Sequence, residues 1–202
     1  MTTVSHALIA AAVGTAAKAP KRLVVAAALG GGVPDLPLAL LTGWTMLRTP
    51  SLEAAHDHMH WAFEHDRLWI VAHNVPHSLV VLGVVALLGG GLWSRGRAGG
   101  VHQLTCRGAW LLWFSLGATL HTLVDIATHV DDGPRFLFPL SSLVQLTGPV
   151  SYWDPAHGGA VFRWLEVALG VLLAAYLGWT WWRSKLGPPE KLRADRHDHG
   201  AG

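Results

Sequence analysis

Five apolar stretches run along the chain, separated by short polar connections. They cover roughly residues 4–17, 23–47, 68–93, 108–130 and 160–182. Each of the last four is long enough to cross about 30 Å of hydrocarbon as an α-helix. The first is long enough only for a thinned or protein-lined region of a bilayer. The pattern predicts an all-α fold, a polytopic transmembrane bundle with four to five spanning helices.

Composition favours the same class of protein. Charged residues make up 14% of the chain, whereas soluble globular domains carry about 25%. The chain also has 11 Trp, a residue that gathers at membrane interfaces. The net charge of +2 is small and scattered, so a nucleic-acid partner is not expected. The expected partners are the lipid bilayer and a small-molecule or lipid substrate.

The basic residues predict how the bundle is oriented. Lys and Arg gather in residues 18–22, in residues 94–107 and after residue 182, whereas the connections 49–66 and 131–159 are acidic, and the first of these two is also rich in His. The positive-inside rule places the basic connections in the cytoplasm. We therefore expect a multi-pass protein of the cytoplasmic (inner) membrane with its C-terminus in the cytoplasm. The N-terminus is outside if residues 4–17 span the bilayer and inside if they only lie on it.

The composition of the two terminal segments predicts the domain boundaries. Residues 1–186 are expected to form one transmembrane domain, and residues 187–202, which begin Gly-Pro-Pro, a disordered cytoplasmic tail. Residues 1–17 end in small side chains, as a signal peptide does. No Lys or Arg precedes their apolar core, so a retained helix is the expectation.

Ionisable side chains at membrane depth are costly and mark functional sites by default. The candidates are His6, Asp35, His73, His77, His121 and Asp125, with His129 nearby. Counted along helices from the nearest cytoplasmic charge, five of them lie at similar depths, about 18 to 27 Å. They come from four apolar stretches, so a common site in the outer half of the membrane is predicted.

Local spacing supports this convergence. His121 and Asp125 are four residues apart and share one helix face. His73 and His77 have the same spacing, but Pro76 lies between them, so we expect a helix to begin near Asn74 and to leave His73 just ahead of it. Asp35 lies among three Gly and two Pro in residues 30–37. Such a helix break at membrane depth is tolerated where it lines a cavity or is buried in protein.

Imidazole and carboxylate together are the ligand set of zinc, manganese or non-haem iron. A single Cys excludes a Cys-rich zinc site. The cofactor expected is therefore a divalent metal, zinc first, with manganese or iron as alternatives. Six ligands exceed one tetrahedral site, so two metals bridged by a carboxylate are considered. Asp35 and Asp125 are the candidate catalytic residues, as metal bridges or proton acceptors.

Several alternatives stay open at this point. His6 alone could serve as a structural hydrogen-bonding group, and His121 and Asp125 as a structural pair. The His-rich residues 56–65 are either a solvated loop or a metal-capturing segment, in which His56 and His60 pair at helical spacing. Asp154 and His157 could complete the site from the outer connection.

The motifs together resemble the membrane-bound metal-dependent hydrolases, also described as LexA-binding, inner membrane-associated hydrolases. The matching residues are His6, Pro34-Asp35, His73 with His77-Ser78, His121-Thr122-Leu123-Val124-Asp125 and Pro139-Leu140-Ser141. The resemblance covers roughly residues 5–145, and that family is distantly similar to zinc-dependent phospholipase C and P1-type nucleases. It implies an all-helical membrane protein with a metal centre and hydrolytic activity. The chain departs from the family at Pro37, where a second Asp is common, and lacks the Arg that often follows the position of His73.

The function expected is that of a metal-dependent hydrolase whose site opens outward and whose metal activates water, with a phosphoester or lipid as substrate. A b-type haem protein is an alternative, against which the two Asp count. A metal transporter is another, although residues 79–88 and 167–175 offer no polar path. A protein that keeps a metal site without turnover is the last.

Overall fold

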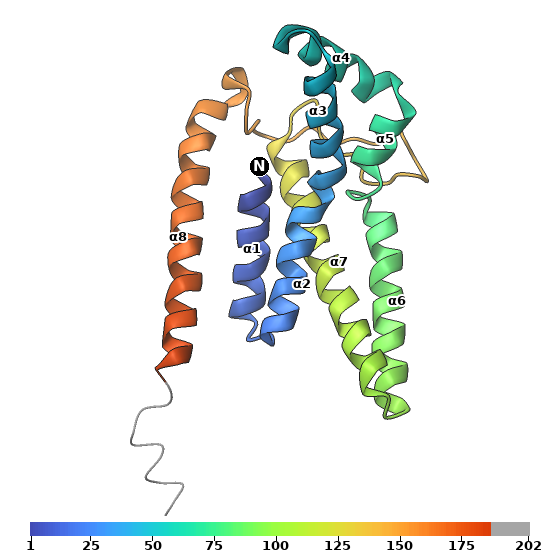
Figure 1. The fold of residues 1–202 in the computed structure, drawn as a ribbon, viewed down its shortest axis with the longest axis vertical. Helices are drawn as coiled ribbons and strands as arrows, with labels where there is room; N and C mark the ends of the chain where they lie inside the picture. The colour runs from blue at the N-terminus through green and yellow to red at the C-terminus, as the bar shows by residue number, and fades with distance from the viewer. Residues whose placement is uncertain (187–202) are drawn as a thin grey trace, which may run out of the picture.

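The structure is a computed structural model that describes residues 1–186; the predicted tail lies outside the described residues. Across residues 1–186 the regular elements are all helical, and the chain forms an elongated helical bundle (Figure 1). The predicted all-α, polytopic architecture is therefore confirmed.

Four helical segments are long and apolar enough to cross a membrane. The first, Lys21–Arg48, comprises α2 (Lys21–Gly32), a 3₁₀ turn (Val33–Asp35) and α3 (Leu36–Arg48). The others are α6 (Leu79–Ala98), α7 (His102–Thr128) and α8 (Gly159–Lys185). Helix α1 (Thr3–Ala16) is apolar but has only 14 residues. The protein is a multi-pass membrane protein, as the apolar pattern predicts.

The predicted break in the second apolar stretch is present. Pro34 and Pro37 lack the amide hydrogen that a continuing α-helix needs, and the chain makes one 3₁₀ turn between α2 and α3. Asp35 is the N-cap residue of α3. The break therefore holds a carboxylate at the junction of two helical segments.

Helix α7 packs tightly against α2 because small residues meet where the two helices cross. A Cβ atom at Gly30 would lie 2.0 Å from the carbonyl oxygen of Phe114, and one at Gly117 would lie 2.1 Å from that of Ala27. Gly31 similarly lets α1 approach, since its Cβ would lie 2.6 Å from the carbonyl oxygen of His6. Helices α1, α2 and α7 are thus held backbone to backbone next to the predicted site residues.

Two expectations about residues 49–93 are wrong. Residues 49–66, expected as a connecting loop, contain helix α4 (Leu52–His65), whose N-cap Ser51 accepts a hydrogen bond from the amide of Ala54. The stretch 68–93 is not one helix beginning near Asn74. Instead α5 (Arg67–Asn74) ends there, and α6 begins at Leu79 with Ser78 as its N-cap. Pro76 disfavours helix at the residue before it, and Ser78 caps the later start.

The segment between α7 and α8 crosses the α5–α6 junction. The amide of Arg135 donates to Asn74 Oδ1 at 2.8 Å, and the amide of Leu79 donates to the carbonyl of Phe136 at 2.8 Å. Ser78 Oγ donates to the carbonyl of Phe138. A second 3₁₀ turn (Pro155–His157) then leads into α8. These bonds hold the turn that carries His77 in a fixed position.

The two ends of the bundle differ in character. The start of α2, the α6–α7 connection and the end of α8 lie at one end, and α4 and α5 lie at the other (Figure 1). Arg22 Nη1 donates to Cys106 Sγ at 3.0 Å, so the basic starts of α2 and α7 are neighbours. The Lys- and Arg-rich connections therefore share one end, away from α4.

Candidate metal centre

Four side chains from three parts of the chain meet between the helices, towards the α4 end of the bundle. They are Asp35 from the 3₁₀ turn, His77 from the α5–α6 turn, and His121 and Asp125 from α7. One ligand atom from each lies within 4.8 Å of the others. The two histidines and Asp125 are buried, and Asp35 is half-buried. These four residues are called the His/Asp cluster below.

The two histidines face both carboxylates through their Nε2 atoms. His121 Nε2 lies 3.0 Å from Asp125 Oδ2 and 3.3 Å from Asp35 Oδ1. His77 Nε2 lies 3.5 Å from Asp35 Oδ1 and 3.6 Å from Asp125 Oδ2. The two Nε2 atoms are 2.9 Å apart. All four groups therefore point into one small volume.

The opposite edge of each ring fixes its tautomer. His121 Nδ1 lies 2.8 Å from the carbonyl oxygen of Gly31, and His77 Nδ1 lies 2.6 Å from that of His73. A carbonyl oxygen only accepts hydrogen bonds, so in both rings Nδ1 carries the proton and donates it. In the neutral imidazole, Nε2 is then an acceptor. This is the arrangement that backbone carbonyls impose on metal-binding histidines.

The cluster therefore gathers two nitrogen lone pairs and two carboxylates with no donor among the four groups, unless an imidazole is protonated. Such a set is stable around a cation. Two nitrogens 2.9 Å apart, each about 2.0–2.1 Å from one ion, subtend about 90° at that ion. The donor set and the spacing fit a divalent transition-metal ion. Doubly protonated histidines paired with the two aspartates are the competing account.

His6 adjoins the cluster without joining the group of four. Its Nε2 lies 2.9 Å from Asp125 Oδ1, and its ring lies against that of His121, tilted by 31°, with centroids 3.9 Å apart. The side chain is buried, but within residues 1–186 neither ring nitrogen has a hydrogen bond of acceptable direction. The close approach at Gly31 is what brings this histidine of α1 next to α7.

His73 lies at the edge of the cluster. It is in the last turn of α5, and its ring centroid is 4.8 Å from that of His77. The side chain is buried, yet both ring nitrogens lack a hydrogen-bond partner within the described residues. Of the six predicted ligands, the structure therefore gathers four, places His6 against Asp125, and leaves His73 beside His77 with free donor atoms.

Other nearby side chains orient the carboxylates and the end of α7. Thr3 Oγ1 donates to Asp35 Oδ2 at 2.6 Å. His129 Nδ1 donates to the carbonyl of Asp125 at 2.9 Å, so this histidine caps the end of α7. The conformation of Asp35 therefore depends on α1 as well as on its own turn.

Asp154 and His157, the two candidate ligands of the connection before α8, pair with each other. His157 Nδ1 lies 2.7 Å from Asp154 Oδ2, and both side chains are partly exposed. This hydrogen bond, together with one from the amide of Ala156, lowers the pKa of Asp154. Neither residue is part of the His/Asp cluster.

Sequence reasoning missed one buried carboxylate. Glu166 of α8 accepts hydrogen bonds from the amide and from Oγ1 of Thr2, both at 2.7 Å. It is 17 residues from Arg183, which corresponds to about 25 Å along a helix. Counting residues along each helix from the nearest basic connection, which identified the other candidates, would therefore have identified Glu166 as well.

The model of one protein family, described as YdjM inner membrane protein, matches residues 1–186. No curated protein and no solved structure matches the chain. The match covers every helix of the bundle and all residues of the His/Asp cluster.

Proposed function

The chain belongs to the YdjM inner membrane protein family, and from its His/Asp cluster we propose that it is a membrane-embedded metal-dependent hydrolase. The observation that supports the proposal most is the orientation of His77 and His121. Backbone carbonyls take both Nδ1 protons, and both Nε2 atoms face two carboxylates. A purely structural pair, such as His121 with Asp125 on one helix, does not require side chains from three parts of the chain to meet at one point.

Asp35, His77, His121 and Asp125 would hold the ion. Zinc suits two imidazoles and two carboxylates best, and manganese or iron accepts the same ligands. When bound in such a site, a divalent ion lowers the pKa of water towards neutrality and so makes a nucleophile available at pH 7. The free nitrogens of His6 and His73 are the donors available for a second ion.

The two aspartates of the cluster have different roles in the proposed reaction. Asp125 is buried and lies against both His6 and His121, so its role is to hold the ion and orient these rings. Asp35 is the most exposed of the four, and Thr3 fixes its second oxygen. We assign Asp35 as the proton acceptor when water attacks the substrate, because a proton leaving it reaches solvent most directly.

The position of the cluster suggests the substrate class. The α2–α3 junction and the α5–α6 turn, which carry Asp35 and His77, lie in the half of the bundle nearer α4, away from the basic connections (Figure 1). With the basic end in the cytoplasm, the cluster faces the outer leaflet. A phosphoester-bearing lipid headgroup is the substrate that reaches this level without leaving the bilayer. A small soluble phosphoester is the alternative source of the same bond.

The haem alternative loses support from the geometry. Axial histidines stand on opposite sides of the iron, each about 2 Å away, so their nitrogens lie about 4 Å apart with the porphyrin between them. His77 and His121 have Nε2 atoms 2.9 Å apart and share their space with two carboxylates. This pair does not leave room for a porphyrin.

The test compares two isosteric substitutions in the full chain. Asp125→Asn removes a charge from the cluster, whereas Asp154→Asn removes one that lies outside it. We expect purified wild-type and Asp154→Asn proteins to hold metal and to hydrolyse a phosphodiester, either bis(p-nitrophenyl) phosphate or phosphatidylglycerol in mixed micelles. Asp125→Asn should lose most of both.

Two results would contradict the proposal. A wild-type protein without bound metal, even after zinc is added and the excess removed, would favour protonated histidines instead. Stoichiometric metal without hydrolysis of either substrate would favour a metal-handling or assembly role. A folded Asp125→Asn protein is recognised by an unchanged elution volume and helical content.

A further inference from the structure

A second pair of histidines faces each other on the outer helix α4. The Nε2 atoms of His56 and His60 lie 3.1 Å apart, and the ring centroids are 4.4 Å apart. Both side chains are exposed. They stand one helical turn apart, whereas the buried face of α4 carries Ala55 and Ala62. No step of the proposed hydrolysis uses this pair.

The same face of α4 is acidic. Glu53, Asp57 and Glu64 stand three or four residues from one of the two histidines, which places all five side chains on one stripe of the helix. All three acidic residues are exposed, and α4 contains no Lys or Arg. The stripe therefore raises the local concentration of cations around the imidazoles.

We propose that His56 and His60 form a second, solvent-exposed binding site for a divalent transition-metal ion such as Zn²⁺. Two nitrogens about 2.0–2.1 Å from one ion and 3.1 Å apart subtend about 100° at that ion, between the octahedral and tetrahedral angles. The rings thus already have the spacing of a chelate. Nitrogen donors select transition metals over Mg²⁺ and Ca²⁺, which prefer oxygen.

Asp57 lies beside His56 on the same stripe of α4. Its Oδ1 lies 3.8 Å from His56 Nδ1, which is longer than a hydrogen bond but places a negative charge behind the imidazole. The carboxylate lies on the Nδ1 side of the ring, whereas Nε2 faces His60. A carboxylate behind a ligating imidazole is the common second partner in metal sites.

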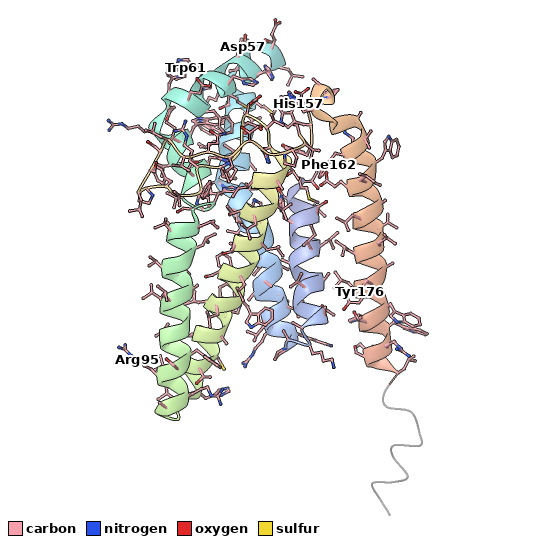
Figure 2. All side chains as sticks on the ribbon, turned by 180° about the vertical axis from the view of Figure 1, so that it is seen from behind. Asp57, Trp61, Arg95, His157, Phe162 and Tyr176 are labelled. Carbon is pink, nitrogen blue, oxygen red and sulfur yellow. The ribbon has the colours of Figure 1, made fainter. Side chains whose placement is uncertain are left out.

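The site is separate from the His/Asp cluster and differs from it in kind. Asp57 and Trp61 lie at the extreme α4 end of the molecule, opposite Arg95 (Figure 2). The cluster offers four ligands in a buried volume, whereas His56 and His60 offer two in water and leave the other coordination positions to solvent. Such a site exchanges its ion readily, which suits capture of metal at the outer surface.

The experiment is a Zn²⁺ titration by calorimetry on the detergent-purified full chain, in a background of His197→Ala and His199→Ala that removes the histidines of the C-terminal segment. His60→Ala and His56→Ala are compared with His58→Ala, which removes an exposed histidine two residues from each, off the stripe. All three positions accept Ala without loss of helix propensity.

We expect His56→Ala and His60→Ala each to weaken one Zn²⁺ binding phase at least tenfold, and the double substitution to weaken it no further, because the two rings act as one chelate. His58→Ala should leave that phase unchanged. The proposal fails if His60→Ala binds as tightly as the parent, or if His58→Ala loses as much. Metal that copurifies with the buried cluster should be the same in all variants, so failure here is distinct from failure of the proposed function.

Discussion

The Nε2 atoms of His77 and His121 lie 2.9 Å apart, although each ring donates its Nδ1 proton to a backbone carbonyl. Two neutral imidazoles in this arrangement direct lone pairs at each other and gain nothing from the contact. Two carboxylates add negative charge on the same side. A cation, either a bound metal or a shared proton, is what this geometry accommodates, and the two are distinguished by measurement.

The first prediction concerns His121. His121→Ala removes the ring that contacts both aspartates, so most copurifying metal should be lost. The protein should still insert, because Ala suits an apolar helix better than His does. The metal content of the purified variant is measured as isolated, and again after chelator treatment followed by added Zn²⁺.

His102→Ala is the matched control, since His102 begins the same helix at the opposite end and is exposed. It should keep the metal content of the wild type. A His121→Ala protein with a full complement of metal would show that the ring is not a ligand.

The second prediction concerns the crossing of α2 and α7. Gly30→Ala inserts a methyl group 2.0 Å from the carbonyl oxygen of Phe114, a position that backbone occupies. The helices must separate, at a cost of about 1–3 kcal/mol. The midpoint of unfolding in increasing SDS should fall accordingly, and metal content should fall with it because Gly31 O positions His121.

Gly32→Ala is the matched control. Its Cβ would meet only side-chain atoms of Ala7 and Thr3, at 3.8 Å, which is ordinary contact. Gly32→Ala should be as stable as the parent or slightly more so, since Ala restricts the unfolded chain. Equal destabilisation by both substitutions would mean that α2 and α7 do not approach as described.

Depth along apolar helices was predictable from the sequence, and it identified most of the cluster. His121 and Asp125 share a face because they are four residues apart, and Asp35 lies at the break that Pro34 and Pro37 impose. Neither inference needs a tertiary contact. The meeting of the three residues with His77 followed from their similar distance to the cytoplasmic charges.

The sequence did not reveal features that depend on partners distant in the chain. Pro76 marked a helix start, but the true start depends on Ser78, which caps α6 and is held by the carbonyl of Phe138. The polar composition of residues 49–66 suggested a loop, whereas Ser51 and the buried Ala55 and Ala62 support a helix. Periodicity of small residues is a weaker signal than that of large apolar ones.

The third prediction concerns Glu166, which attaches α8 to α1. Within the described part of the chain, α8 buries only Gly159 and Glu166, and the carboxylate accepts two hydrogen bonds from Thr2. Glu166→Ala leaves a polar amide without its partner, so the thermal midpoint in detergent should fall by the equivalent of about 1–3 kcal/mol. Differential scanning fluorimetry provides the measurement.

Glu166→Gln keeps an acceptor oxygen and should restore most of the lost stability. Arg163→Ala, on an exposed position of the same helix, should have little effect. If Glu166→Ala melts like the wild type, α8 is held to the bundle by other contacts.

The fourth prediction concerns orientation. The basic ends of α2, α6, α7 and α8 are all at the same end of the bundle (Figure 1), and the positive-inside rule assigns that end to the cytoplasm. Cys106, the only cysteine of the chain, lies there against Arg22. A membrane-impermeant maleimide should therefore label Cys106 only in permeabilised cells. The control is Ala156→Cys in a Cys106→Ser background, because Ala156 is exposed in the connection before α8. This cysteine should react with the maleimide in intact cells. Labelling of Cys106 in intact cells would reverse the topology and would place the His/Asp cluster in the cytoplasmic half of the membrane, where an outer-leaflet lipid does not reach it.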